Sequence, residues 1–318
     1  MEQNEQSFLA GARAVSAGEP TPAARAPDGE DSRLSQALSL ATMGRHEEAI
    51  RSLDRALEAD PTLAAAWSNK GTSLACLGRH EEAVRCYAKA LELDPGCART
   101  WTNRGNSLHS LGRLEEAIRC HDRALELEPR FAGALSNKGN CLRDLGRHKK
   151  ALRCYDRALK LDPGDADTWL MKAATLGILG RHAAAIRCYD EALELDPLNA
   201  DAWNHKGNAL QLLGRQDEAI CCLDKALELD PGHLLAWTNK GNSLAILGRF
   251  EEAMRCFEEA LELDPGDVFA WFNKASAEER LGHLEKAARS YRQFLALAPL
   301  QYTEQVEYAR RRLGELDG

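Results

Sequence analysis

The strongest constraint on the fold is a tandem repeat that prolines and glycines mark along the chain. Eight of the 11 prolines recur at a constant interval of 34, at Pro61, Pro95, Pro129, Pro163, Pro197, Pro231, Pro265 and Pro299. A glycine stands half a period before each of them, at Gly44, Gly78, Gly112, Gly146, Gly180, Gly214, Gly248 and Gly282. A period of about 20 to 50 residues is typical of solenoids and other tandem arrays. With the proline as position 32, the predicted repeats are residues 30–63, 64–97, 98–131, 132–165, 166–199, 200–233, 234–267 and 268–301.

Each repeat has the pattern of two short helices. In residues 64–97, apolar or small side chains fall at positions 4, 8, 11 and 14 and again at 20, 24, 27 and 28, which is helical spacing and not the alternation of a strand. The glycine at position 15 suits the left-handed residue that ends a helix, and the proline at position 32 cannot continue the second one. Two such helices cannot bury their apolar faces alone, so neighbouring repeats must stack. The sequence therefore predicts an all-α solenoid.

The repeat resembles the tetratricopeptide repeat in its tryptophan, glycine, alanine, aromatic and proline positions. All six tryptophans occupy position 4, at Trp67, Trp101, Trp169, Trp203, Trp237 and Trp271. Position 8 is glycine in five repeats, at Gly71, Gly105, Gly139, Gly207 and Gly241. Position 20 is alanine in every repeat, and position 24 is Tyr or Phe in five, with His121 as a departure. The resemblance implies a right-handed superhelix of helix pairs whose concave groove binds extended peptides.

The two ends of the array differ from its middle, as expected of repeats that have one face in water. The first repeat has Arg33 at position 4, and the eighth has Ala275 at position 8 and Glu278 at position 11. In residues 302–318, apolar side chains at helical spacing predict a helix that caps the last repeat. Residues 1–29, which are rich in Ala, Gly, Pro and charged residues, predict a disordered tail.

Charge and composition narrow the choice of partner and compartment. With 41 Lys plus Arg against 49 Asp plus Glu, the net charge of -8 disfavours nucleic acid and anionic membranes as ligands. No apolar run approaches the ~18 residues of a membrane span, and the N-terminal residues lack the basic and apolar regions of a signal peptide. These features predict a cytoplasmic protein whose ten cysteines are reduced.

Cysteine also recurs with the repeat, which raises the question of a metal or redox site. Six cysteines share position 23, at Cys86, Cys120, Cys154, Cys188, Cys222 and Cys256. Equivalent residues of neighbouring repeats are expected about 10 Å apart, which is too far for a disulfide or a shared metal. His121 follows Cys120 directly, and adjacent helical side chains diverge by about 100°, so these two cannot form a catalytic dyad. We therefore expect no metal, no cofactor and no catalytic site.

Asparagines recur on the side of the first helix opposite its core positions. Positions 2, 5, 6, 9, 12 and 13 share that side, which in the resembled family lines the peptide groove. Nine asparagines stand at positions 6 or 9, at Asn69, Asn103, Asn106, Asn137, Asn140, Asn208, Asn239, Asn242 and Asn273. An amide both donates and accepts, so this row is predicted to pair with a peptide backbone of any sequence. The alternative is that these amides hydrogen-bond neighbouring helices.

The same side changes character along the chain. The third and fourth repeats present polar side chains such as His109 and Arg143. The fifth to eighth add large apolar ones, at Leu170, Ile178, Leu212, Leu235, Ile246, Phe269 and Phe272. Because exposed apolar groups on one face mark interaction sites, Leu235, Phe269 and Phe272 are candidate anchors for a partner. The alternative for Phe269 and Phe272 is burial beneath the capping helix.

The sequence thus predicts a noncatalytic scaffold that binds a protein or peptide segment. Some members of the resembled family hold chaperone C-termini with a dicarboxylate clamp, which needs Lys at position 5. No repeat has Lys there, so we expect no clamp. Two other classes stay open: a regulatory or targeting subunit of an enzyme complex, and a self-associating structural protein. The fold constrains the mode of binding and not the identity of the partner.

Overall fold

The computed structural model describes residues 30–298 and 303–316, and these residues form seventeen helices and no strand. The first helices of the repeats are α2 (Glu30–Thr42), α4 (Ala64–Cys76), α6 (Ala98–Ser110), α8 (Ala132–Asp144), α10 (Ala166–Ile178), α12 (Ala200–Leu212), α14 (Leu234–Ile246) and α16 (Val268–Arg280). The second helices are α3 (His46–Ala59), α5 (His80–Leu93), α7 (Leu114–Leu127), α9 (His148–Leu161), α11 (His182–Leu195), α13 (Gln216–Leu229), α15 (Phe250–Leu263) and α17 (Leu284–Leu297), followed by α18 (Thr303–Leu316). This alternation confirms the all-α prediction. The tail predicted for residues 1–29 lies outside the described residues.

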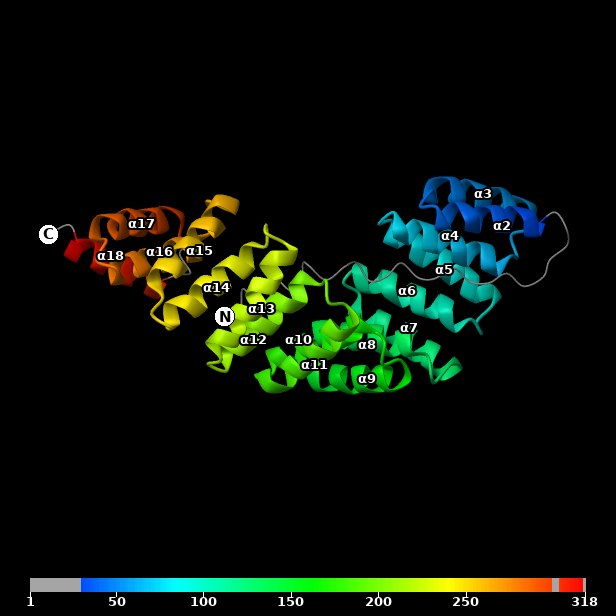
Figure 1. Ribbon diagram of the computed structural model, residues 1–318. Helices are drawn as coiled ribbons and strands as arrows, with labels where there is room; N and C mark the ends of the chain where they lie inside the picture. Colours follow the sequence, from blue (N-terminus) through cyan, green and yellow to red (C-terminus); the bar gives the residue numbers. More distant parts are fainter. Residues whose placement is uncertain (1–29, 299–302, 317–318) are drawn as a thin grey trace. The chain divides into compact units, whose positions relative to one another are not determined.

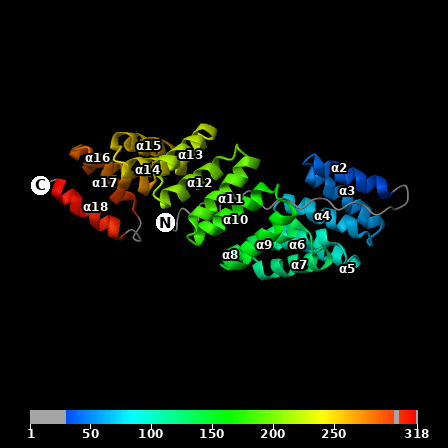
Figure 2. The same cartoon turned by 60° about the horizontal axis from the view of Figure 1, so that its bottom comes forward.

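The chain divides into two units, residues 1–175 and 176–318, and the division falls within α10. Within each unit, consecutive helices pack side by side in antiparallel pairs (Figure 1), and a second view shows the same stacking (Figure 2). First helices of adjacent repeats also touch, as α4 touches α6 in the first unit and α12 touches α14 in the second. The first helices of each unit therefore form a layer.

The glycine at position 15 gives every first helix its end. All eight of these glycines have a positive φ, between 69° and 77°, which other residues adopt only with strain. Around Gly78, the amide of Arg79 donates to Leu74 O at 2.9 Å and that of Gly78 donates to Ala75 O at 3.0 Å. These two bonds are the Schellman pattern, which satisfies the last carbonyls of the helix. The glycine therefore fixes where each turn occurs.

Inside a repeat, the glycine at position 8 makes room for the ring at position 24. A Cβ at Gly139 would lie 2.5 Å from the ring of Tyr155, so the two helices approach this closely only because the residue is glycine. Tyr155 and its equivalent Phe257 are fully buried. In the third repeat, His121 fills this place against Gly105 and is also fully buried.

Two sets of contacts recur between neighbouring repeats. The indole nitrogen of each tryptophan at position 4 donates to the carbonyl of the preceding proline, as Trp237 Nε1 does to Pro231 O at 2.9 Å. The lysine at position 7 reaches an acid on the preceding second helix, as Lys240 Nζ reaches Asp224 Oδ1 at 2.6 Å. The same ammonium lies 5.5 Å from the centre of the Trp237 ring. These lysines therefore join one repeat to the next.

The last helix, α18, covers the end of the eighth repeat as predicted. Val306 and Ala309 pack against Tyr291 and Phe294 of α17. Arg312 also forms an ion pair with Glu279 of α16. The cap therefore buries apolar surface that a following repeat would otherwise cover.

Candidate functional site

The candidate site is the side of the first helices that turns away from the second helices, here called the first-helix face and defined as positions 2, 5, 6, 9, 12 and 13. Helical periodicity separates this face from positions 4, 8 and 11, which pack against the second helix. Within the face, burial follows the contact between adjacent first helices. Positions 5 and 6 are buried at that contact, as Ser68 (2% exposed) and Asn69 (4%) illustrate, whereas position 13 is open in Ile246 (67%).

Three asparagines of the predicted row donate hydrogen bonds to neighbouring helices, which was the alternative to binding a peptide backbone. Asn239 Nδ2 donates to Asn204 Oδ1 at 2.9 Å, and Asn103 Nδ2 donates to Thr72 Oγ1 at 3.4 Å. Asn273 Nδ2 donates to Asn242 Oδ1 at 2.9 Å. The physical reason is that position 6 of one first helix faces positions 5 and 9 of the previous one. These three bonds therefore join adjacent first helices.

The remaining asparagines are placed differently. Asn140 accepts from the hydroxyl of Tyr155 at 2.8 Å within its own repeat. Asn106, Asn137 and Asn208 are half-buried on the face. The carbonyl oxygen of Asn106 is buried and has no hydrogen-bond partner among the described residues. The equivalent oxygen in the next repeat, on Asn140, accepts from the Tyr155 hydroxyl. The oxygen of Asn106 lacks this donor because His121 stands where the fourth repeat has the tyrosine.

The three predicted apolar anchors fall into two groups. Leu235 is half-buried and Phe269 is 40% exposed, so both reach the surface. Phe272 instead packs within the cap, with its ring centre 5.1 Å from that of Phe294 and 5.9 Å from that of Tyr308. For Phe272 the alternative of burial near the capping helix describes the structure better than an exposed anchor does. The reason is that α18 returns over the last repeat.

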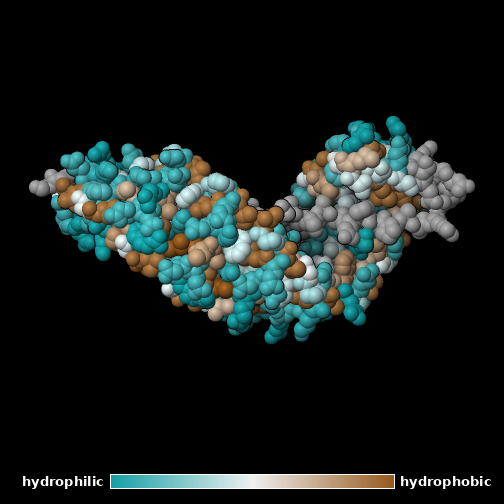
Figure 3. All heavy atoms as spheres, in the orientation of Figure 1, coloured by the Kyte–Doolittle hydropathy of each residue, from teal (hydrophilic) through white to brown (hydrophobic). Residues whose placement is uncertain are grey.

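Position 13 carries a row of exposed apolar side chains in the second unit. Ile178 is 39% exposed, Leu212 44% and Ile246 67%. They stand at position 13 of three consecutive repeats, on α10, α12 and α14. The face of the molecule shown in Figure 3 mixes hydrophilic and apolar groups. The sequence placed all three residues on this side of the first helices, but it did not single them out as anchors, because the exposed fraction of a side chain cannot be derived from helical spacing.

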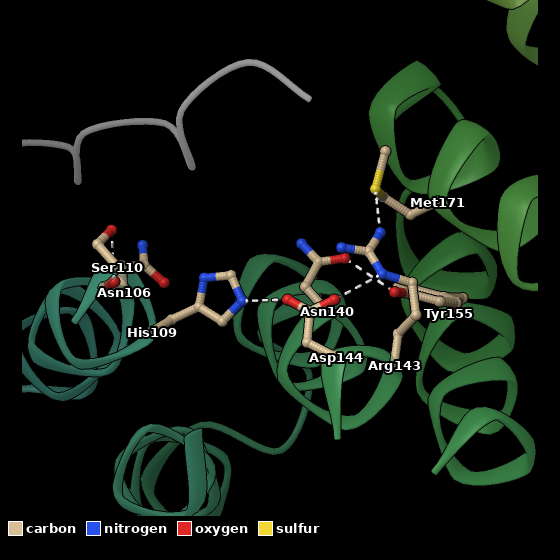
Figure 4. A network of polar contacts seen from close by, with 8 residues as sticks. All are labelled: Asn106, His109, Ser110, Asn140, Arg143, Asp144, Tyr155 and Met171. Atoms are coloured by element: carbon tan, nitrogen blue, oxygen red, sulfur yellow. Dashed lines mark hydrogen bonds and ion pairs between the residues drawn. The ribbon is translucent and has the colours of Figure 1, made fainter. Parts of the chain in front are cut away.

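Positions 12 and 13 of the third and fourth repeats carry a polar network instead (Figure 4). His109 Nε2 lies 2.7 Å from Asp144 Oδ2, and Arg143 Nε donates to Asp144 Oδ1 at 2.9 Å. Burial alone raises the pKa of Asp144, but the hydrogen bond from His109 and the charge of Arg143 outweigh it, so the net pKa lies below the ordinary value. The aspartate therefore stays ionised. The sequence did not predict that Asp144 accepts hydrogen bonds from both His109 and Arg143.

The repeated cysteines pack inside the array. The six at position 23 are all buried thiols. Burial raises the pKa of Cys222 and of Cys256 to about 11, so both are protonated at neutral pH. In the part of the chain that the structure describes, no three His, Cys, Asp or Glu side chains are grouped to hold a metal ion. None of the described helices has the length and apolar character of a membrane span.

Models of the tetratricopeptide repeat match the chain along most of its length. The matched residues are 31–95, 62–127, 132–165, 170–233, 235–267 and 256–289. The chain belongs to the tetratricopeptide repeat family, whose members mediate protein–protein interactions. A comparison with curated proteins gives no match.

Solved structures agree with this assignment. YrrB, described as a TPR protein with an unusual peptide-binding site, is 28% identical over 59% of this chain and 96% of its own, with a TM-score of 0.53. The pilF protein of Pseudomonas aeruginosa is 24% identical over 65% of this chain and 94% of its own, with a TM-score of 0.59. A tetratricopeptide repeat protein from Parabacteroides merdae is 19% identical over 80% and 97%, with a TM-score of 0.57. The last two show the shared fold.

Proposed function

We propose that the chain is a noncatalytic scaffold that binds a segment of another protein on its first-helix face, with residues 30–301 as eight repeats and 302–318 as the cap. The observation that carries the proposal is the apolar row of Ile178, Leu212 and Ile246. Exposed apolar side chains gathered on one face mark interaction sites more often than chance. More than a third of each side chain stays exposed after the repeats have stacked, and this apolar area is available to a partner.

The spacing of the row favours a chain segment over a small molecule. Adjacent first helices touch, so equivalent side chains on α12 and α14 are expected about 10 Å apart. Three such anchors span about 20 Å, which an extended chain covers in about six residues at roughly 3.3 Å each. A partner that meets all three is therefore a peptide or protein segment of at least about seven residues.

Polar groups suited to a peptide backbone lie beside the row. Asn208 and Asn242 precede Leu212 and Ile246 by about one helical turn. Asn242 uses its carbonyl oxygen for Asn273, so its amide nitrogen can still donate. Donors next to apolar anchors are what recognition of an extended segment needs. The peptide-binding site of YrrB supports the same class of ligand.

The experiment is affinity capture from native extract with mass spectrometry, using three baits. These are the wild-type chain, the double variant Leu212→Ser with Ile246→Ser, and a control with Leu195→Ser and Leu263→Ser. Leu195 (46% exposed) and Leu263 (47%) end second helices of the same unit, so the control removes similar exposed apolar area from another surface. We expect the first variant alone to lose the partner, by more than about 1 kcal/mol of binding free energy.

Other outcomes would favour the two alternative classes. Capture of an enzyme whose turnover changes on binding would indicate a regulatory or targeting subunit. Sedimentation velocity that shows concentration-dependent growth of the chain alone would indicate a self-associating structural protein. Equal partner loss in both double variants would place the binding surface outside the first-helix face.

A further inference from the structure

The guanidinium of Arg143 lies on the first-helix face with most of its hydrogen-bonding capacity unused. The side chain is only 7% exposed, and Nε donates to Asp144 as described above. Nη1 meets Met171 Sδ at 2.6 Å, and a thioether is a weak acceptor. No hydrogen bond to Nη2 occurs among the residues that the structure describes. In Figure 4 one terminal nitrogen is directed at Met171. One of five N–H groups therefore meets a charged acceptor.

The one carboxylate beside Arg143 is also shared with a second donor. The carboxylate of Asp144 serves both Arg143 and His109, at 2.9 and 2.7 Å. A buried charge with too few partners costs folding free energy. At position 12 the other repeats have Ala41, Ala75, His109, Gly177, Gln211, Ala245 and Glu279. The fold therefore does not require an arginine at position 12. An additional acceptor would satisfy the terminal nitrogens of Arg143.

A second donor is oriented beside it. Asn140 uses its carbonyl oxygen to accept from Tyr155 at 2.8 Å, which leaves its amide nitrogen to donate. In Figure 4 that nitrogen lies on the side of His109. Asn140 and Arg143 stand at i and i+3 on α8 and so share one face of the helix. Together they offer a guanidinium edge and an amide to the same ligand.

We infer that Arg143 and Asn140 bind a carboxylate of the partner segment, either an acidic side chain or a free C-terminus. A planar guanidinium pairs with a carboxylate through two parallel N–H···O bonds, and this pairing would satisfy the terminal nitrogens. A phosphate fits less well, because a dianion would meet the ionised Asp144 beside Arg143 and the net charge of -8. The inference rests on the proposed function, and it assigns the ligand chemistry of the first unit.

The test uses the full-length chain and defined probes. The probes are acetylated pentaalanine as the free acid, acetylated Ala-Ala-Glu-Ala-Ala amide, acetylated pentaalanine amide as the neutral control, and inorganic phosphate. Binding is followed at constant ionic strength through the NMR signal of the Arg143 Nε–H group. We expect both carboxylate peptides to give saturable shifts and the neutral peptide to give none. The tighter of the two identifies a C-terminus or a side chain as the source. Shifts no larger than those of the neutral peptide, or tighter binding of phosphate, would overturn the inference.

Variants separate binding from a structural role. Arg143→Gln should weaken the carboxylate peptides at least about tenfold, whereas Arg130→Gln, the same charge change at an exposed residue, should leave them unchanged. Asp144→Asn removes the competing carboxylate and should tighten binding about threefold or more. This gain keeps the inference testable if Arg143→Gln unfolds, because a purely structural arginine predicts no gain. Equal or weaker binding by Asp144→Asn would contradict the inference.

The same measurements distinguish this inference from the proposed function. If a captured partner depends on Leu212 and Ile246 but the carboxylate peptides do not bind, the scaffold function stands and the carboxylate site is wrong. If the peptides bind through Arg143 and the captured partner ignores the first-helix face, the proposed function fails while the carboxylate site remains.

Discussion

The fourth and seventh repeats share one scaffold and present opposite chemistry. Both pack a glycine at position 8 against a buried ring at position 24, Tyr155 in one and Phe257 in the other. At positions 12 and 13, however, the fourth repeat has Arg143 and Asp144, while the seventh has Ala245 and Ile246. The recurring residues hold the array together, and in the proposed function the residues that change on the first-helix face decide what it binds. Fold and function can therefore be altered separately.

The largest expected effect is the loss of stability when the buried ring at position 24 is removed, and it tests whether the fourth and seventh repeats are packed equally well. Tyr155→Ala in the first unit and Phe257→Ala in the second each remove a fully buried ring. We expect each to lower the free energy of unfolding by about 3–5 kcal/mol, because the cavity cannot close without moving two helices. Urea unfolding followed by circular dichroism measures the loss. A loss below about 1 kcal/mol for one of them would show that the scaffolds differ.

The third repeat breaks the pattern at His121, which makes its stability depend on pH. Burial lowers the pKa of His121 to about 3, from an ordinary value of 6.5. The folded state therefore keeps the ring neutral while the unfolded chain binds a proton below pH 6.5, so the free energy of unfolding falls as the pH drops toward 3. The largest slope from this group is about 1.4 kcal/mol per pH unit.

This dependence is measured as the difference in unfolding free energy between His121→Tyr and the wild-type chain from pH 8 to pH 4. His205, whose pKa burial lowers to about 4, is present in both chains and cancels. We expect the advantage of the variant to grow as the pH falls below 6.5. A difference that stays constant over this range would show that the folded chain protonates His121.

At neutral pH, the same substitution restores the arrangement of the fourth repeat. Neither ring nitrogen of His121 has a hydrogen-bond partner among the described residues, and neither does the carbonyl oxygen of Asn106. A tyrosine hydroxyl at this position would donate to Asn106 as Tyr155 donates to Asn140. We expect a gain of about 1–3 kcal/mol in unfolding free energy at pH 7.5, measured by urea unfolding.

His121→Phe is the matched control for that gain. It removes the unsatisfied nitrogens without supplying Asn106 with a donor, so its stability should lie between those of the wild-type chain and the tyrosine variant. A tyrosine variant no more stable than the phenylalanine variant would contradict the proposed hydrogen bond to Asn106.

The smallest expected effect is the coupling free energy of the Lys–Asp ion pairs between repeats. Lys70 with Asp54 in the first unit and Lys240 with Asp224 in the second have the same geometry, at 2.5 and 2.6 Å. Double-mutant cycles with alanine should give coupling free energies of about 0.3–1 kcal/mol in both units, because the pairs are partly exposed. A coupling above about 2 kcal/mol in one unit only would show that the repeats are not held alike.

The repeat made the scaffold predictable from the sequence. Gly78 and Pro95 fix where helices end through backbone geometry alone, and local geometry of this kind can be predicted without tertiary information. The cap was predictable for a similar reason, since the apolar spacing of residues 302–318 is that of a helix with one buried face.

The site was less predictable, because its residues depend on which side chains adjacent helices bury. Asn239 and Ile246 both belong to the side predicted to line the groove, yet one is 4% exposed and the other 67%. Helical periodicity assigns a residue to a side, but the contact between neighbouring first helices decides whether it reaches the surface. Phe272 shows the same limit, because its burial depends on where α18 returns.

The most direct test of the central claim is hydroxyl-radical footprinting of the chain with and without its captured partner. The second unit serves as its own control, since oxidation reports individual side chains on both its first-helix face and its second helices. The account predicts that the partner lowers the oxidation of Ile178, Leu212 and Ile246 and leaves Leu195, Leu229 and Leu263 on the second helices unchanged. Protection of those three leucines with none at position 13 would contradict the claim that the first-helix face binds the partner.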